Sequence, residues 1–305
     1  MGVWTNGSLV GRWVIPASGP MEFTYDPARV ASSEARPLSL SLPMNLDGVP
    51  LKGERVGFFF DNLLPDSEVI RRRIQSRFHT PKGDAFDLLA AIGRDCVGAV
   101  QLLPDGTAPS RPFQIDATPL NDGEIERALL GAVSEPALSL GEDDDFRISI
   151  AGAQEKTAFT WHEGRWCKPH GATPTTHIFK LPLGLVGGMK LDMSQSLENE
   201  WLCARIVQEY GVPIASCDLR RFGNTQALVV TRFDRKLHSS GKYWLRLPQE
   251  DFCQATGTPS HAKYESDGGP GLVEIARLLQ ASEARADDLA TILRAQLLFW
   301  MLAAT

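Results

Sequence analysis

A turn built from small residues is the first place in this sequence that could hold a phosphate. Residues 145–157 read Asp-Phe-Arg-Ile-Ser-Ile-Ala-Gly-Ala-Gln-Glu-Lys-Thr, a pattern typical of a strand, a tight turn and a return strand. Ala151, Gly152 and Ala153 would leave the backbone N–H groups of the turn open to an anion, and Ser149 lies just before them. The stretch therefore predicts a phosphate-binding loop, and an ordinary hairpin turn is the alternative.

A lysine and a glutamate farther along the chain would complete such a site. Lys180 lies on a predicted strand, and a helix is predicted from Ser194 to Tyr210. On that helix Glu200 lies about 60° from Leu197, at the flank of the apolar stripe, whereas Glu198 points away from it. We therefore expect Glu200 to pair with Lys180, as in sites where an ion pair fixes a phosphate-binding lysine. The alternative is that both residues are surface charges.

The turn does not match the common nucleotide-binding motifs. A P-loop requires GxxxxGK[ST] at the start of a helix, but Gly152 is followed by Lys156 and Thr157 without a second glycine, and the next segment is β-like. The turn also lacks the GxGxxG pattern of protein kinases. Motif rules by themselves therefore leave the site open.

Length and composition favour a folded chain of roughly two domains, because 305 residues is about twice the usual domain length. The hydrophobic content of 43% and the charged content of 22% are ordinary for a globular protein. The net charge of −6 argues against autonomous DNA binding, but it is compatible with a local basic patch or a DNA-binding partner.

The cysteines and histidines predict neither disulfides nor a zinc site. The five cysteines are widely spaced without a CxxC pair, and His170 and His177 have no neighbours at metal-ligand spacing. No stretch approaches 18 uninterrupted apolar residues, and the N-terminus has no signal-peptide pattern. We therefore expect a cytoplasmic protein with reduced thiols and no membrane contact.

The first third of the chain predicts a mixed α/β unit. Asn6-Gly7 between two β-prone runs predicts a hairpin, and the alternation of Arg36–Pro43 predicts a half-buried strand. Ser67 can cap a helix that ends near Phe78. This helix has a basic face that is either solvated or a partner surface, formed by Arg71, Arg72, Arg73 and Arg77.

The remaining chain divides at a polar, proline-rich connection. We expect an N-terminal subdomain over residues 1–105, a connection with a short helix over 106–144, and a second domain over 145–305. In the second domain Gly184–Gly188 reads as a flexible loop, and Leu272–Leu279 and Leu289–Ala304 read as helices.

Several long blocks of the sequence resemble the HipA family, the serine/threonine-kinase toxins of bacterial toxin–antitoxin modules. The resemblance covers nearly the whole chain. The blocks that carry it are Arg36–Pro43, Phe60–Asp66, Ile92–Asp95, Asp145–Thr157, Pro174–His177, Arg246–Asp251 and Lys263–Gly271. The resemblance implies an α+β, protein-kinase-like fold, with an N-lobe β-sheet and the start of a helical C-lobe, and an extra N-terminal α/β subdomain.

The resemblance also assigns roles to individual residues. It implies that Lys180, held by Glu200, contacts the phosphates of ATP, and that Ser149 is an autophosphorylated serine whose added negative charge would eject the loop and switch the kinase off. The implied nucleotide contacts are the phosphate loop Ala151, Gly152, Ala153, Gln154, Glu155 and Lys156, the hinge Thr231, Arg232 and Phe233, and Asp234 and Gln249 near ribose and adenine.

One part of the family's machinery is not found in this sequence. The family's DxHxxN-like catalytic loop and its later metal-binding aspartate are absent, and the apolar run Leu297–Thr305 stands where that loop would begin. We therefore expect the ligands of Mg²⁺ to lie beyond residue 305 and the 305-residue chain alone to be inactive. A terminal helix buried in the chain's own core is the alternative for the apolar run.

The resemblance finally implies partners. They are a DNA-binding antitoxin of the HipB kind, operator DNA reached through that antitoxin, and a protein substrate of the translation machinery such as an aminoacyl-tRNA synthetase, whose phosphorylation causes growth arrest and persistence. Two alternatives stay open, a non-catalytic corepressor that docks the antitoxin through the Arg71–Arg77 helix and a nucleotide-binding pseudokinase.

Overall fold

The computed structural model describes residues 1–133, 154, 156–186 and 188–303. Most of the predicted turn therefore lies outside the described residues, including Ser149, Ala151, Gly152, Ala153 and Glu155. In the described part of the chain, each helix is too short or too polar to cross a bilayer.

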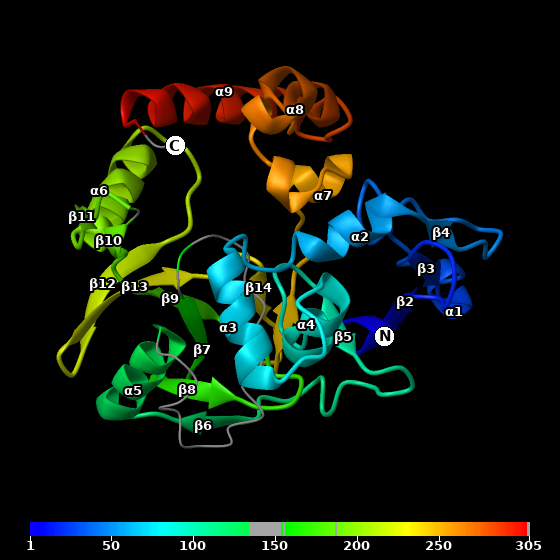
Figure 1. Ribbon diagram of the computed structural model, residues 1–305, viewed down its shortest axis with the longest axis horizontal. Helices are drawn as coiled ribbons and strands as arrows, with labels where there is room; N and C mark the ends of the chain where they lie inside the picture. Colours follow the sequence, from blue (N-terminus) through cyan, green and yellow to red (C-terminus); the bar gives the residue numbers. More distant parts are fainter. Residues whose placement is uncertain (134–153, 155, 187, 304–305) are drawn as a thin grey trace.

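The N-terminal part is an antiparallel sheet covered by helices (Figure 1). Its strands, in the order β4-β3-β2-β1-β5, are β1 (Gly2–Thr5), β2 (Ser8–Val14), β3 (Glu22–Tyr25), β4 (Leu51–Lys52) and β5 (Gln101–Leu103). Its helices are α1 (Pro27–Val30), α2 (Glu54–Asp61), α3 (Glu68–Phe78) and α4 (Ala85–Ile92). The predicted hairpin is confirmed, because Asn6 and Gly7 join β1 to β2 with φ angles of 46° and 84°.

The core of this part lies between the sheet and helices α2 and α4. Trp13 of β2 stacks on Phe60 of α2 with ring centroids 3.9 Å apart, and Phe86 of α4 meets Trp13 edge to face. Trp13, Phe59 and Phe60 are almost completely buried. Aromatic stacking of this kind adds to the burial of large apolar side chains, so these rings are the main source of stability here.

The second domain is built on a six-stranded antiparallel sheet of order β12-β13-β9-β7-β8-β6. Its strands are β6 (Ala117–Pro119), β7 (Lys156–His162), β8 (Arg165–Pro169), β9 (His177–Lys180), β12 (Cys217–Phe222) and β13 (Thr225–Thr231). Helix α5 (Asp122–Val133) packs Ile125 and Leu129 against Phe159, Phe179 and Phe222 of this sheet. The predicted connection 106–144 thus supplies both an edge strand and a covering helix to the second sheet.

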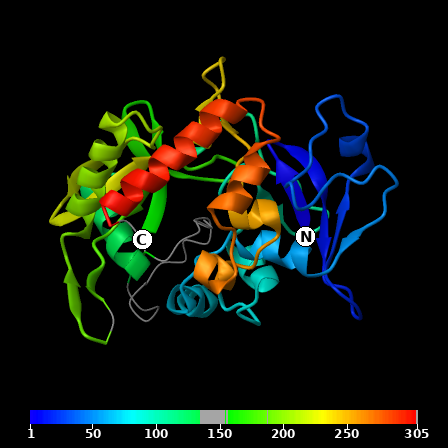
Figure 2. The ribbon, with the colours of Figure 1, turned by 90° about the horizontal axis from the view of Figure 1, so that it is seen from above.

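Four further helices lie in the upper part of Figure 1 and face the viewer when the molecule is seen from above (Figure 2). They are α6 (Ser196–Glu209), α7 (Phe252–Thr256), α8 (Leu272–Leu279) and α9 (Arg285–Met301), with two short ribbons formed by β10 (Gly184–Val186), β11 (Leu191–Met193), β14 (Arg235–Leu237) and β15 (Trp244–Arg246). Helix α9 buries Ala295 and Leu298 against Val207 and Val212, while Leu297 and Trp300 on its other side stay exposed.

Two of the predicted elements are wrong. Arg36–Pro43 contains only an isolated bridge between Ser39 and Leu42, because both of its inner serines are buried and donate hydrogen bonds to the carbonyl of Gln254. In this segment the serines face inward, whereas Leu40 is 59% exposed, so the alternation of Leu and Ser does not mark an apolar strand face here. The predicted loop at Gly184–Gly188 contains strand β10, whose Gly184 pairs with Met193 of β11.

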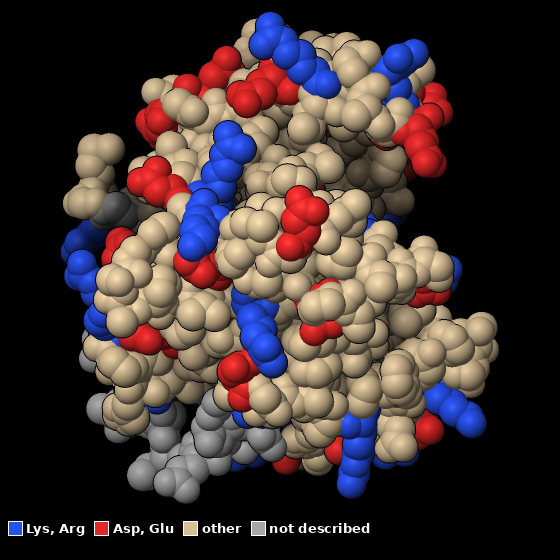
Figure 3. All heavy atoms as spheres, turned by 90° about the vertical axis from the view of Figure 1, so that its right-hand side faces the viewer, with Lys and Arg blue, Asp and Glu red and all other residues tan. Residues whose placement is uncertain are grey.

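The predicted helix after Ser67 is confirmed, but its basic face is divided. The Ser67 hydroxyl caps α3 by accepting a hydrogen bond from the Ile70 amide. Arg71 turns inward and donates to Asp61 at 2.7 Å, while Arg72 and Arg77 remain exposed. On the side of the molecule that carries the N-terminal sheet, basic and acidic side chains are interspersed (Figure 3).

The Trp13–Phe60 stack predicts a large effect of one truncation. Phe60 is 0% exposed, so Phe60→Ala should lower the free energy of unfolding by about 3–5 kcal/mol through lost burial and the cavity it leaves. Urea unfolding followed by circular dichroism measures this. Leu46 is 78% exposed, so Leu46→Ala is the control and should change stability by less than about 0.5 kcal/mol. Equal losses in the two variants would contradict this account of the core.

Candidate nucleotide site

The end of β13 and the segment after it form one wall of a cavity of about 280 Å³. All five residues that were predicted for the hinge and the base contacts line this cavity, namely Thr231, Arg232, Phe233, Asp234 and Gln249. Residues that the sequence did not indicate complete the wall, and they are Asn62, Val97, Ile178, Ala215, Val230, Asp251 and Gln254. Asn62 and Val97 belong to the N-terminal domain, so the cavity lies where the two domains meet.

The hinge offers an apolar ring and a backbone donor to a ligand. Phe233 is 67% exposed at the cavity, so its ring presents a flat surface on which a purine can stack. The amides of Thr231 and Arg232 donate to the carbonyls of Ser216 and Thr176. Among the described residues, the amide of Phe233 has no backbone acceptor.

The predicted ion pair of the site is present. Lys180 Nζ lies 2.5 Å from Glu200 Oε1, and both side chains are partly exposed. Glu198 instead accepts a hydrogen bond from Gln226 at 3.0 Å, as the helical phase of α6 predicts. Lys180 projects from the same face of β9 as Ile178, which lines the cavity, because side chains two residues apart on a strand share a face.

The described residues of the predicted phosphate loop, Gln154 and Lys156, lie beside the end of β9. Gln154 Nε2 donates to the carbonyl of Leu181 at 2.6 Å. Lys156 of β7 is directly opposite Lys180 of β9 in the antiparallel register, so the two side chains share one face of the sheet. Two ammonium groups and one carboxylate therefore lie on the sheet two residues along β9 from Ile178, which lines the cavity.

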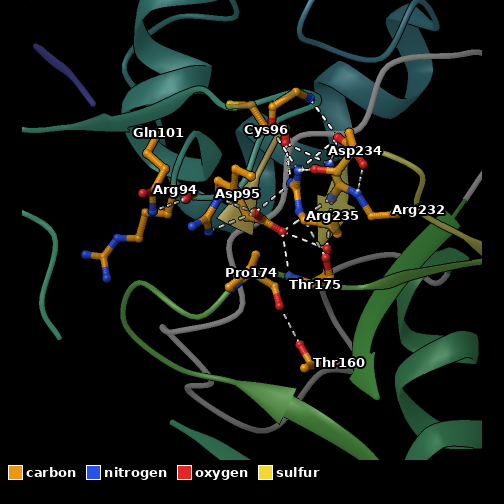
Figure 4. Close-up of polar contacts among 12 residues, drawn as sticks. Arg94, Asp95, Cys96, Gln101, Thr160, Pro174, Thr175, Arg232, Asp234 and Arg235 are labelled. Carbon is orange, nitrogen blue, oxygen red and sulfur yellow. Dashed lines mark hydrogen bonds and ion pairs between the residues drawn. The ribbon is translucent and has the colours of Figure 1, made fainter. Parts of the chain in front are cut away.

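A buried ionic network lies directly behind the hinge (Figure 4). Asp95, in the loop after α4, accepts hydrogen bonds through Oδ1 from Arg235 Nη2 at 3.0 Å and from Arg246 Nε at 3.1 Å. Its Oδ2 accepts from the Thr175 amide at 3.0 Å and hydroxyl at 2.6 Å, and lies 3.4 Å from Arg232 Nη1. A single carboxylate of the N-terminal domain thus joins three arginines of the second domain.

Asp234 forms the second centre of this network. Its carboxylate receives a bidentate pair of hydrogen bonds from Arg232, with Nε at 3.0 Å and Nη2 at 2.7 Å. Arg235 Nη1 donates to the same carboxylate at 2.9 Å, and the Gly98 amide donates at 2.8 Å. Asp234 was predicted near ribose and adenine. It does line the cavity, but both of its carboxylate oxygens are engaged in the network.

The network carries an excess of positive charge. Its three guanidinium groups and two carboxylates give a formal sum of +1 in an environment where each side chain is 8% exposed or less. The arginines use much of their remaining donor capacity on the backbone carbonyls of Cys96, Gly98, Thr175 and Ala172. Arg246 Nη2 lies 2.9 Å from Asp95 but is not aligned for a hydrogen bond, so one buried donor stays unsatisfied.

These contacts keep both carboxylates ionised. Burial alone would raise the pKa of Asp95, but the positive charges of Arg235, Arg246 and Arg232 and the Thr175 hydrogen bond hold that pKa well below its ordinary value of 3.8. Burial also opposes ionisation of Asp234, yet its hydrogen bond and charge interactions with Arg232 and Arg235 lower its pKa as well.

The described residues contain no cluster of three or more histidine, cysteine, aspartate or glutamate side chains that could hold a metal ion. The Mg²⁺ ligands expected beyond residue 305 therefore stay a prediction. The groups that the described part of the site offers to an ATP–metal complex are the two lysines, Glu200 and the hinge.

Comparison with known proteins gives the same family throughout the chain. Residues 1–103 match the HipA N-terminal domain, and residues 148–305 match the HipA-like C-terminal domain. The candidate kinase Y4mE of Sinorhizobium fredii is 33% identical over 288 residues, covering 93% of this chain and 66% of that protein. The serine/threonine-protein kinase toxin HipA of Shewanella oneidensis is 29% identical over 237 residues, covering 77% of this chain and 50% of the toxin.

A solved structure shares the fold. It is the complex of Shewanella oneidensis HipA, HipB and operator DNA, which matches with a TM-score of 0.76 and 23% identity over 98% of this chain and 68% of the chain in that structure. The predicted α+β, kinase-like fold with an extra N-terminal subdomain is thereby confirmed. The chain spans 66% and 50% of the lengths of the two curated relatives. The sequence matches over both domains and the shared fold establish that the chain belongs to the HipA family.

Proposed function

We propose that the complete protein is a serine/threonine-kinase toxin that transfers the γ-phosphate of ATP to a serine. The observation that carries this proposal is the position of the Lys180–Glu200 pair beside a cavity lined by all five predicted hinge and base-contact residues. In phosphoryl transfer, a lysine fixed by a glutamate orients the phosphates while a separate segment holds the base. The proposal concerns the complete protein because the curated relatives are longer than this chain.

The charges at one end of the cavity suit a triphosphate. Lys156 and Lys180 project from directly opposed positions of β7 and β9, where like charges repel and an anion between them is stabilising. Glu200 keeps Lys180 in place through its ion pair. The loop Ala151–Lys156 would then cover the phosphates, and bound Mg²⁺ would neutralise the charge that develops during transfer.

The other end of the cavity suits adenine. The amide of Phe233 supports a hydrogen bond to the base, and its exposed ring supports stacking. Because the contacts use backbone groups and an aromatic face, the uncharged Thr231 at the start of the hinge is no obstacle. Gln249 also lines the cavity and can bind a polar edge of the base or the ribose.

We further propose the regulation and target that the family resemblance implies. Phosphorylation of Ser149 would add about −1.5 to −2 charge next to the phosphate loop and would switch the kinase off. The substrate would be a translation component such as an aminoacyl-tRNA synthetase, and its phosphorylation would cause growth arrest.

The Lys180–Glu200 pair yields the decisive test of catalysis. In the complete protein, Lys180→Met and Glu200→Gln should each lower the rate of autophosphorylation by about a hundredfold or more, because the phosphates lose their fixed cation. Transfer of labelled γ-phosphate, with intact mass for the site, measures this. Glu198→Gln is the matched control, since Glu198 lies on the same helix but contacts Gln226, and it should retain full activity. Loss of activity in all three variants alike, or in none, would sink the proposed role of the pair.

We also propose a DNA-binding antitoxin as partner, supported by the HipB–DNA complex of the structural relative. The exposed arginines of α3, Arg72 and Arg77, are the part of the basic helix that is free to meet it, because Arg71 is bound to Asp61. The charge reversal Arg72→Glu/Arg77→Glu should weaken antitoxin binding about tenfold or more by removing interfacial charges. Calorimetry with the purified antitoxin measures the change. Arg220→Glu/Arg221→Glu on β12 is the control, and equal affinities of the two double variants would rule out α3 as the docking element.

A further inference from the structure

The nucleotide cavity is built partly by a loop of the N-terminal domain. Residues 95–98, which we term the Asp95 loop, lie in the connection between α4 and β5, and Val97 of this loop lines the cavity. Val97 is half-buried, whereas its neighbours Asp95, Cys96 and Gly98 are buried. The loop therefore has one side chain facing the cavity and the rest facing the protein behind it.

The same loop is bound to the hinge segment by one carboxylate, two backbone carbonyls and one backbone amide. The Asp95 carboxylate binds Arg232 and Arg235, which lie on either side of Phe233 and Asp234. The carbonyl of Cys96 accepts from both of these arginines at 2.9 Å. The Gly98 amide donates to Asp234 and its carbonyl accepts from Arg235 at 2.8 Å.

The loop also contacts Gln249, a second residue that lines the cavity. A Cβ atom on Gly98 would lie 2.5 Å from the carbonyl oxygen of Gln249, and Gly98 has a φ of +69°. Only glycine permits this backbone conformation and this close approach together. The backbone of the loop thus packs directly on Gln249, which lies beside the hinge segment because the Leu247 amide donates to the carbonyl of Asp234.

We propose that the Asp95 loop is a positioning element for the adenine end of the nucleotide site, with Asp95 as its positioning residue. This inference rests on the proposed function. Asp95 is not among the residues that line the cavity. It fixes Arg232 and Arg235, and these two side chains hold the backbone of the hinge at the position where Phe233 can receive a base. The kinase-like domain therefore depends on its N-terminal neighbour for a complete adenine site.

The charge of the network explains why one carboxylate matters for this geometry. With Asp95 ionised the cluster has a formal charge of +1. An amide in its place would leave three buried guanidinium groups facing the single carboxylate of Asp234. Burying an additional unpaired charge is strongly unfavourable, so the arginines must separate or admit water. Arg232 lies within the hinge itself, and its displacement moves the backbone that binds adenine.

The test separates the adenine end of the site from the phosphate end. The complete protein is titrated with a fluorescent ATP analogue, which is then displaced by ATP, by adenosine or by inorganic tripolyphosphate. Asp95→Asn should weaken the binding of ATP and of adenosine by about tenfold or more. It should leave the affinity for tripolyphosphate within about twofold, because Lys156 and Lys180 are untouched. Glu126→Gln is the matched control. It makes the same carboxylate-to-amide change at the other end of β13, where Glu126 binds Asn224 and Thr225, and it should alter none of the three affinities.

Unchanged adenosine affinity in a folded Asp95→Asn protein would overturn the inference, and so would equal losses for adenosine and tripolyphosphate, which would indicate general damage. If Asp95→Asn does not fold, Val97→Trp decides, because it fills the cavity from the same loop without touching the network. That variant should lose adenosine binding and keep tripolyphosphate binding, and unaltered adenosine affinity would overturn the inference. A wild-type protein that binds no ATP would instead contradict the proposed function and this inference together.

Discussion

The burial of Asp95 among three arginines is the constraint on which the arrangement of this protein depends. Five charged side chains can leave water only if each finds partners at the same moment, because a single unpaired buried charge costs several kcal/mol, on the order of the whole stability of a domain. The carboxylate comes from the first hundred residues and the guanidinium groups come from residues 232–246. Asp234 pairs with Arg232 and Arg235 within the second domain, but Asp95 and the partner of Arg246 are supplied only when the two domains are docked.

The Asp95 network and the Lys180–Glu200 pair differ in how far their side chains are buried. The Asp95 network is enclosed, rigid and shielded from salt, as suits a support that must not move. The Lys180–Glu200 pair is partly exposed, so solvent screens it and it adds little to stability. A screened pair can exchange partners at low cost, which is what a lysine needs if it is to bind and release a phosphate. In the proposed function, support of the hinge and contact with the ligand therefore fall to separate groups of side chains.

Local chemistry determined much of the fold and part of the site from the sequence alone. The Asn6-Gly7 hairpin, the Ser67 cap and the choice of Glu200 over Glu198 follow from turn, cap and helix geometry, which act over a few residues and hold wherever the segment packs. The same reasoning failed at Arg36–Pro43, because alternation predicts a strand with its leucines buried, whereas here Ser39 and Ser41 are buried against Gln254 and Leu40 is exposed.

Only the tertiary structure decided which residues meet across the domains. Asp95, Val97 and Gly98 are separated from the hinge by about 135 residues, and no periodicity links such positions. Asp95 and Arg246 lie within blocks of the sequence that resemble the HipA family, but such a block does not reveal which residues it contacts in the folded protein. A charged residue in a sequence is expected at the surface. It can be buried only where the folded domains bring ion-pair and hydrogen-bond partners to it. The sequence therefore predicted the Lys180–Glu200 pair, while only the fold showed that Asp95 of one domain contacts Arg232, Arg235 and Arg246 of the other.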